Sequence, residues 1–511
     1  MKIMKINIYT GALALAASLV LASCGGRNSI SSADTQNNTN CNAPKYIFYF
    51  VGDGMSQPQI SMAEKAISEA GFRDQFNKQT CNIYGHNGGE LNLRKFSTVG
   101  MATTNAENRF ITCSAAAATA LATGHKTTIN TISMNGDRTE NLATVAEMAH
   151  QHGMKVGVIS SVSIDHATPA CFYAHAEDRN NYEAIGGWLL RSGFDFFGGG
   201  FVRWDTYKDI TKDQFLDSLK TMGYTVASSR ADFDALGANT GKALATVPKN
   251  IEKMHDSGTL PYNIDLDIQT SDDNRIVLRD FVAKAVEMLY NTENGFFLFC
   301  EGGKIDWADH ANDAVSNVYE TLALNAAIGV AMDFYGKHPD ETLIVFTGDH
   351  ECGGLTLGFA GTHYESAFDL MKNQTVSFEE FQAEMREFVK TNSFEAVLSR
   401  LHEAFGLGGD GGLKLSEYET KRLREAYLYS RGDKKSTITA EERELFYAYY
   451  EPVTVTATTI LDNKAGVEWA SFSHTALPVP VYSIGCGSDM LSGYFDNTDI
   501  PNTIMKVSGW K

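Results

Sequence analysis

The sequence predicts an α/β protein: a doubly wound, largely parallel central sheet with helices on both faces, plus a helical insertion. Short, continuous apolar segments of strand length recur along the chain, and stretches of helical pattern separate them. Strands that are apolar at every position are buried on both faces, as in parallel sheets covered by helices. The 511 residues are 43% hydrophobic and 21% charged, which excludes a largely disordered chain.

Five segments carry the strand prediction, and a helical stretch at residues 142–152 precedes the second of them. In order they are residues 45–51 (KYIFYFV), 155–162 (KVGVISSV), 295–300 (GFFLFC), 342–346 (TLIVF) and the short 481–484 (VYSI). In sheets of this class ligands bind beyond the carboxyl ends of the strands. The polar residues that follow the strands are therefore the first candidates for a functional site.

Residues 361–452 break the alternation of strands and helices. They are richer in charge and helical in pattern, and Ser377 with Glu380 and Thr439 with Glu442 have the spacing of capping boxes. We interpret this segment as a helical insertion within a catalytic domain that spans residues 44–511.

Residues 1–23 are expected to be a lipoprotein signal peptide. Two lysines precede an apolar stretch at residues 11–22, which is shorter than the roughly 20 residues of a membrane-spanning helix. The stretch ends in Leu21-Ala22-Ser23-Cys24, which resembles a bacterial lipobox and implies a lipid on Cys24. A plain secretion signal with a chance cysteine is the alternative.

Residues 24–43 are rich in Ser, Asn and Thr and are expected to form a flexible tether. Together with Cys24, this segment predicts an exported protein on the periplasmic or cell-surface face of a bacterial membrane. Eight cysteines are present; without Cys24 seven remain, so at least one thiol cannot pair within the chain. Disulfides are compatible with an exported protein.

The net charge is −19 at pH 7, from 43 Lys+Arg and 62 Asp+Glu. A negative surface repels nucleic-acid phosphates, and no run of basic residues offsets this repulsion. We therefore expect no nucleic-acid partner.

Carboxylates follow three of the predicted strands directly: Asp53, Glu301 and the pair Asp349-His350. Asp53 alone would be interpreted as a turn residue, and the Asp349-His350 dipeptide alone is a weak signal. Three strand ends that each deliver a carboxylate favour a cation site.

A helix near Glu301 and a distant histidine extend this set. Asp306 and His310 are spaced i, i+4, which places them on one face of a helix with a spacing suited to zinc. A surface helical pair is the alternative, and His474 could supply a further imidazole. Ser114 begins an alanine-rich helical run, where helix N-termini favour anions, although an ordinary N-cap serine has the same pattern.

With these residues in order, the chain resembles the alkaline phosphatases. The resemblance spans roughly residues 44–360 and 453–500, with residues 361–452 outside it. The matching blocks are Val51-Gly52-Asp53-Gly54-Met55; Ser114-Ala115 with Ala118-Thr119-Ala120 and Thr123-Gly124; Ala167-Thr168-Pro169-Ala170 with Ala174-His175 and Arg179; Glu301-Gly302 with Ile305-Asp306 and Asp309-His310; Thr342-Leu343-Ile344-Val345 with Asp349-His350; and His474-Thr475.

The resemblance implies two zinc ions and one magnesium ion per chain. It assigns Asp306, His310 and His474 to the first zinc, Asp349 and His350 to the second with Asp53 bridging to the third ion, and Asp53, Thr168 and Glu301 to that third ion. Imidazole-bearing sets suit zinc and an all-oxygen set suits magnesium, so the donor types agree with this assignment.

The resemblance also implies a phosphomonoesterase that releases an alcohol and inorganic phosphate through a phosphoserine at Ser114. Arg179 would bind two oxygens of the phosphate with its guanidinium fork. Homodimers are usual in the family. The alternatives are a phosphodiesterase or sulfatase of the same superfamily, and a phosphate-binding protein that has lost catalysis.

Three residues depart from the family pattern. Cys113 stands where an aspartate commonly orients the arginine, so Arg179 is expected to be held less firmly. His166 and Trp307 also differ between family members. We expect both to contact the substrate or to lie just behind the residues around the phosphate and the third metal, with simple packing as the alternative for Trp307.

Overall fold

The structure is a computed structural model, and it describes residues 43–84, 89–203, 206–247, 258–269, 275–291 and 293–510. These residues belong to one compact unit, Asn40–Lys511. The expected signal peptide, Cys24 and nearly all of the tether lie outside the described residues. Within the described ranges no helix has the length and apolar character needed to cross a membrane.

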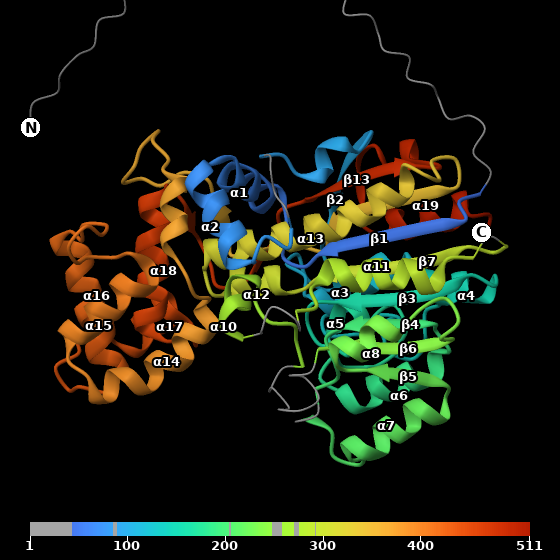
Figure 1. Cartoon of the computed structure of the whole chain (residues 1–511), viewed down its shortest axis with the longest axis horizontal. Helices are drawn as coiled ribbons and strands as arrows, with labels where there is room; N and C mark the ends of the chain where they lie inside the picture. The colour runs from blue at the N-terminus through green and yellow to red at the C-terminus, as the bar shows by residue number, and fades with distance from the viewer. Residues whose placement is uncertain are drawn as a thin grey trace, which may run out of the picture. The chain divides into compact units, whose positions relative to one another are not determined.

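A ten-stranded sheet forms the centre of this unit (Figure 1). Only β13 runs antiparallel to its neighbours, β2 and β8, within the sheet as described, so the prediction of a largely parallel sheet is confirmed. In spatial order the strands are β14 (Gly493–Asp496), β2 (Thr98–Thr103), β13 (Val479–Gly485), β8 (Thr342–Gly348), β1 (Tyr46–Gly52), β7 (Phe296–Gly302), β3 (Lys155–Ser160), β4 (Phe196–Gly199), β6 (Lys242–Thr246) and β5 (Tyr224–Ala227).

The central strands are mostly apolar because each of their faces packs into a separate core. In β1, Phe48 and Phe50 enter one apolar cluster, while Tyr49 and Val51 enter the other on the opposite face. Successive side chains of a strand point to opposite faces, so a strand buried on both faces needs apolar residues at every position.

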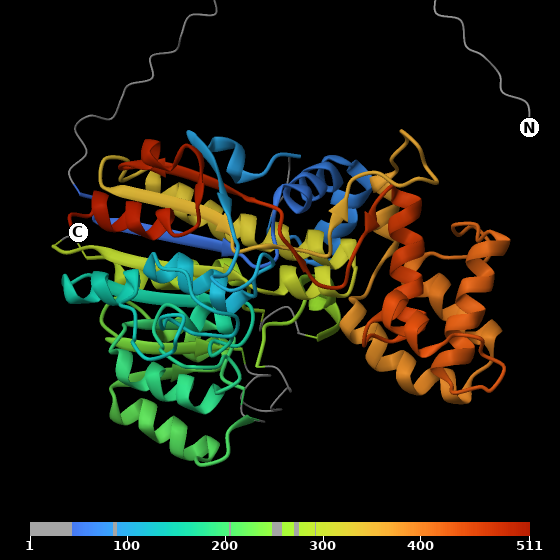
Figure 2. The same cartoon turned by 180° about the vertical axis from the view of Figure 1, so that it is seen from behind.

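Helices cover both faces of the sheet (Figures 1 and 2). One core is completed by α1 (Gln57–Ser68), α2 (Ala70–Gln79), α8 (Arg230–Ala235), α11 (Leu278–Leu289), α12 (Lys304–His310) and α13 (Ala314–Tyr335). The other is completed by α3 (Ser114–Thr123), α4 (Val145–Gln151), α5 (Ala167–Ala170), α6 (Tyr182–Ser192), α7 (Lys212–Thr221) and α19 (Asp499–Val507). Short elements complete the fold: α10 (Leu266–Gln269), and the 3-10 helices η1 (Asn92–Lys95), η3 (Asn263–Asp265), η5 (Phe368–Asn373) and η6 (Ser488–Leu491).

The segment expected to be a helical insertion is helical. It contains α14 (Phe378–Thr391), α15 (Phe394–Phe405), α16 (Glu417–Ser430) and α17 (Ala440–Tyr447), and α18 (Pro452–Ala465) packs against α14 and α16 just beyond its predicted end. Thr439 and Glu442 form the expected capping box, whereas Ser377 caps α14 by accepting a hydrogen bond from Glu380 N. These helices gather at the end of the sheet where the parallel strands finish (Figure 2).

Two short antiparallel strand pairs are separate from the ten-stranded sheet. The strand β9 (Glu351–Cys352) pairs with β12 (His474–Thr475), and β10 (Leu355–Thr356) pairs with β11 (Glu468–Trp469). The first pair brings the chain after β8 next to the late histidine. Among the described residues, Cys113, Cys171, Cys300 and Cys352 are free thiols, and Cys486 is in a disulfide bond.

Candidate active site

The three central strands end level with one another, because β1 pairs in register with both β7 and β8. Asp53 follows β1, Glu301 is the next-to-last residue of β7, and Asp349-His350 follows β8. All four side chains are fully buried. The register of the sheet therefore brings together the strand-end residues that the sequence singled out.

The first group of possible metal ligands joins α12 to β12. On α12, Asp306 Oδ2 lies 3.4 Å from His310 Nε2, and Asp306 Oδ1 lies 3.5 Å from His474 Nε2. The Nδ1 atoms of the two histidines lie 2.7 Å and 3.0 Å from the carbonyl oxygens of Phe472 and Thr112. A carbonyl only accepts, so each Nδ1 carries a proton, and in the neutral ring each Nε2 then presents a lone pair. The two Nε2 atoms face each other at 3.1 Å, an arrangement that favours a cation between them.

The second group centres on His350. Its Nε2 lies 3.2 Å from Asp349 Oδ2, 3.5 Å from Asp53 Oδ1 and 3.3 Å from Ser114 Oγ. Asp349 Oδ1 accepts hydrogen bonds from the backbone N–H groups of Gly54 and His350, which fixes the carboxylate with Oδ2 in the site. The His350 and His474 rings stack at 3.6 Å between centroids, so the first and second groups are adjacent.

The third group contains Asp53, Glu301 and Thr168. Thr168 Oγ1 donates to Asp53 Oδ2 at 3.4 Å, and Ser160 donates to Glu301. His166 joins this group, because its ring nitrogen lies within 4.8 Å of carboxylate oxygens of Asp53 and Glu301. We expected His166 in the vicinity of the third metal, and the structure places it among the possible ligands.

In the absence of metal, burial shifts the pKa values of the acidic cluster. It raises the pKa of Asp53 well above its ordinary value, with Asp349 adding to the shift, and raises the pKa of Glu301 to about 8 and of Asp349 to about 7. Burial acts in the same direction on Asp306, but His310 and His474 outweigh it and hold its pKa well below the usual range.

Each of these four carboxylates keeps one buried oxygen without a hydrogen-bond partner in the part of the chain that is described. Buried unpaired carboxylate oxygens are costly unless a cation satisfies them. Two groups offer imidazole nitrogen with carboxylate oxygen, and the third is mainly oxygen, which suits a centre of zinc and magnesium type. The residues present therefore fit the metal centre that the resemblance implies.

Ser114 is the first residue of α3, and its N-cap is Cys113. Arg179 Nη2 lies 2.9 Å from His166 Nε2, and Arg179 N donates to Asn130 O. Cys113 Sγ accepts from Asn130 N at 3.3 Å. Cys113, which stands where the family commonly has aspartate, thus contacts the backbone at Asn130. The guanidinium of Arg179 is instead contacted by His166.

A cavity of about 440 Å³ lies over these groups. His166 and Trp307 both line it, with their rings edge to face at 5.9 Å, so neither lies apart from the site. The other lining residues are Ser114, Arg179, Asp306, His310 and His474 from the sheet domain, and Phe378, Glu379, Gln382, Tyr449 and Tyr450 from the helical insertion and its edge.

Sequence reasoning missed two sets of residues here. Cys352 belongs to the first group with Asp306, His310 and His474, although only its place two residues after His350 could have drawn attention to it. The cavity residues of the helical insertion carry no spacing that marks them as functional.

A buried serine at a helix N-terminus, an arginine and adjacent groups of possible metal ligands beyond a parallel sheet indicate a metal-dependent hydrolase of phosphate esters. The model of the alkaline phosphatase family matches residues 44–189 and 240–509. The chain belongs to the alkaline phosphatase family and is a phosphatase. The match includes the helical insertion, so our expectation that the insertion lies outside the family pattern was wrong. The match leaves out residues 190–239.

Individual relatives agree with this assignment. The chain is 28% identical over 473 residues to alkaline phosphatase 4 of Bacillus subtilis (strain 168), covering 90% of this chain and 88% of that protein. The crystal structure of a cold-active alkaline phosphatase from a Shewanella psychrophile has a TM-score of 0.71 at 26% identity, covering 91% of this chain and 99% of that one. A variant of TAB5 alkaline phosphatase, described with Mg bound, has the same fold at 23% identity, with a TM-score of 0.60 and coverage of 92% and 99%.

Proposed function

We propose that the protein hydrolyses phosphate monoesters to an alcohol and inorganic phosphate through a phosphoserine at Ser114. The observation that carries this proposal is the position of Ser114 Oγ, 3.3 Å from His350 Nε2 in a cavity that Arg179 also lines. Ser114 lies at the N-terminus of α3, where free N–H groups and the helix dipole favour a phosphoryl group.

The side chains around Ser114 have distinct roles in this proposal. Arg179 binds two nonbridging oxygens of the phosphate through its guanidinium fork. His166 holds that guanidinium from behind through its Nε2 atom, and Trp307 packs against His166 at the cavity wall. The phosphate is thus oriented with its ester bond away from Ser114, as in-line attack by the hydroxyl requires.

Two zinc ions and one magnesium ion complete the proposed site. When bound, they would lower the pKa of the serine hydroxyl and stabilise negative charge on the attacking and leaving oxygens. The proposed ligands are Asp306, His310 and His474 for the first zinc; Asp53, Asp349 and His350 for the second; and Asp53, Thr168 and Glu301 for the magnesium. The unpaired oxygens of the four carboxylates support these assignments.

Export with lipid attachment at Cys24, on the periplasmic or cell-surface side of a membrane, remains part of the proposal and rests on the lipobox-like segment. Homodimer formation is proposed only because homodimers are usual in the family. Expression in a bacterial host with radiolabelled fatty acid tests the first point, since replacing Cys24 by Ser should abolish the label. Light scattering of the purified protein tests the second.

Purified protein is expected to contain about two zinc ions and one magnesium ion per chain and to prefer a monoester over a diester or a sulfate ester of the same alcohol. Complete chelation should reduce monoester turnover about 10²-fold or more, and added zinc and magnesium should restore it. Metal analysis and steady-state kinetics measure both quantities. A preference for the diester would favour the phosphodiesterase alternative, and full activity after chelation would contradict the metal assignments.

A further inference from the structure

We propose that the Cys352 sulfur is a ligand of the first metal ion, in addition to Asp306, His310 and His474. This inference rests on the proposed metal centre and extends its donor set from oxygen and nitrogen to sulfur. Cys352 is not among the residues of the alkaline phosphatase motifs quoted above.

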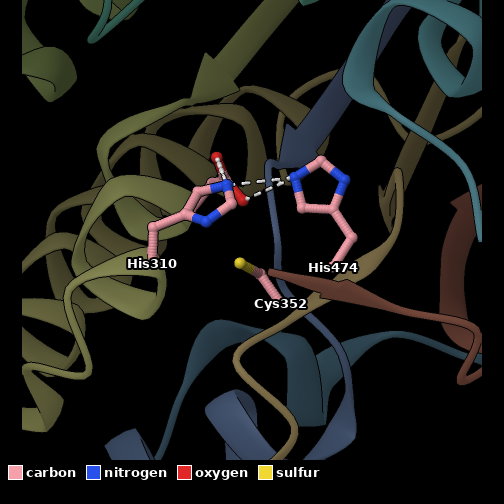
Figure 3. A group of neighbouring side chains, drawn as sticks. His310, Cys352 and His474 are labelled. Carbon is pink, nitrogen blue, oxygen red and sulfur yellow. Dashed lines mark hydrogen bonds and ion pairs between the residues drawn. The ribbon is translucent and has the colours of Figure 1, made fainter. Parts of the chain in front are cut away.

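The strand register positions Cys352. In the β9–β12 pair Cys352 lies directly opposite His474, and side chains of directly paired residues lie on the same face of a sheet. The side chain is fully buried, and the thiol is free. Figure 3 shows it close to the imidazole rings of His310 and His474, with its sulfur on the side of His310.

The ligand atoms of the four residues lie within 4.8 Å of one another. Ligand atoms around tetrahedral zinc lie about 3 to 4 Å apart, so a small inward movement of the side chains would close the set around one ion. An independent observation also points to a ligand: Asp306 Oδ1 is buried in this group and has no hydrogen-bond partner among the described residues. The facing Nε2 lone pairs of His310 and His474 point to the same space.

A sulfur donor changes which metals the site prefers. Thiolate sulfur is a soft ligand that favours zinc, cadmium and cobalt over magnesium or manganese. Binding of the cation releases the thiol proton to solvent and leaves the thiolate on the metal. The first site should therefore bind soft divalent ions more tightly than a site with only carboxylate and imidazole donors.

Cobalt(II) provides a direct test with a readout other than activity. Metal-free protein loaded with Co²⁺ should show a near-ultraviolet sulfur-to-cobalt charge-transfer band together with visible d–d bands. Cys352→Ser and Cys352→Ala should remove the charge-transfer band, keep the d–d bands and weaken Cd²⁺ binding about tenfold or more. Cys171→Ser is the matched control, because this buried thiol belongs to none of the groups of possible metal ligands among the described residues. Its contacts, with Thr119 Oγ1 and Ala115 O, are ones that a hydroxyl can also make.

The spectra separate the two levels of the proposal. Visible d–d bands without a charge-transfer band in the unmodified protein would overturn the role of Cys352 and leave the metal centre intact. A charge-transfer band that persists in both Cys352 variants would also overturn it. Failure to bind Co²⁺ at all would contradict the metal centre and the Cys352 proposal together.

A separate observation supports a second inference: the geometry points to Tyr449 as a stacking surface for the leaving alcohol. Tyr450 is 8% exposed and is fixed by ring contacts with Phe378 at 5.7 Å and with Tyr449 at 4.4 Å. Tyr449 itself is 66% exposed and lines the same cavity as Ser114. The exposed part of the Tyr449 ring can therefore stack on a flat group of a substrate whose phosphate is bound at Ser114.

The acidic side chain in this wall of the cavity does not oppose an uncharged aromatic group. Glu379 in this wall is paired with the buried Lys304 at 3.2 Å, so its charge is already balanced. The Gln382 side-chain amide also lines the cavity and can hydrogen-bond to the edge of a base. We infer that the preferred monoesters, within the proposed function, are those whose alcohol carries an aromatic ring, such as nucleoside monophosphates.

Adenosine 5′-monophosphate and ribose 5-phosphate test this inference, because they share the leaving oxygen and differ in the base. The protein should have the higher kcat/KM for the nucleotide, and Tyr449→Ala should lower the ratio of the two values about three- to tenfold. Tyr449→Phe should keep the ratio, and so should Tyr418→Ala, which removes an exposed tyrosine elsewhere in the helical insertion. An unchanged ratio in Tyr449→Ala would overturn the inference, whereas loss of both activities in the unmodified protein would contradict the proposed function.

Discussion

Ser114→Ala is expected to reduce kcat for phosphate monoesters about 10³-fold or more, because the proposed covalent route loses its nucleophile. The serine Oγ lies beside His350 Nε2, and the side chain lines the cavity with Arg179. Alanine leaves Arg179 and the carboxylate cluster in place, so phosphate binding and metal content should change little. Acid quenching during turnover, followed by intact mass measurement, should detect one added phosphoryl group in the unmodified protein and none in the variant.

Ser393→Ala provides a matched control for this experiment. Ser393 is the N-cap of α15 and accepts a hydrogen bond from Ala396 N. Its replacement therefore also perturbs a helix N-terminus, but Ser393 is not among the residues that line the cavity. This variant should form the phosphoserine at the normal rate. Turnover of Ser114→Ala close to that of the unmodified protein, or a phosphoryl group on another residue, would contradict the nucleophile assignment.

The centre of the sheet was predictable because it is made of strands with strong local patterns. The runs that became β1, β7 and β8 are apolar at nearly every position, which is the pattern of strands buried on both faces. Several outer strands were not predictable. In β4 (Phe196–Gly199) two of four residues are glycine, and Gly199 adopts φ +99° where a Cβ would lie 2.0 Å from Ser160 O. Glycine is required there, yet it weakens the local strand signal.

The residues of the site also differ in how far the sequence could predict them. Asp53, Glu301 and Asp349 follow strong strand patterns, and the i, i+4 spacing of Asp306 and His310 is local, so these residues could be proposed from the sequence. Cys352 and Tyr449 could not, because their positions depend on contacts across the fold. The pairing of β9 with β12 places Cys352 opposite His474, and the packing of the helical insertion brings Tyr449 to the cavity.

In metal-free protein, the stabilising contribution of Glu301 and Asp349 is expected to be lost as the pH rises from about 4 to about 8. Over this range the thermal midpoint should fall by about 5 °C or more relative to that of the metal-loaded form. In the absence of metal, burial raises the pKa of Glu301 from 4.5 to about 8 and of Asp349 from 3.8 to about 7. A carboxyl whose pKa is raised by folding stabilises the native state fully below its unfolded value. That contribution is lost as the pH rises through the folded value.

Bound divalent cations should remove this dependence, because the ionised carboxylates then have positive partners. Asp165 and Asp265 also have pKa values raised to about 7 by burial, but they act equally in both forms. The difference between the melting curves of metal-free and metal-loaded protein across this pH range therefore isolates the metal centre. Glu301→Gln should flatten the curve of the metal-free protein by removing one titrating group. If the two forms have the same pH dependence, the buried carboxylates do not hold cations, and the proposed centre is wrong.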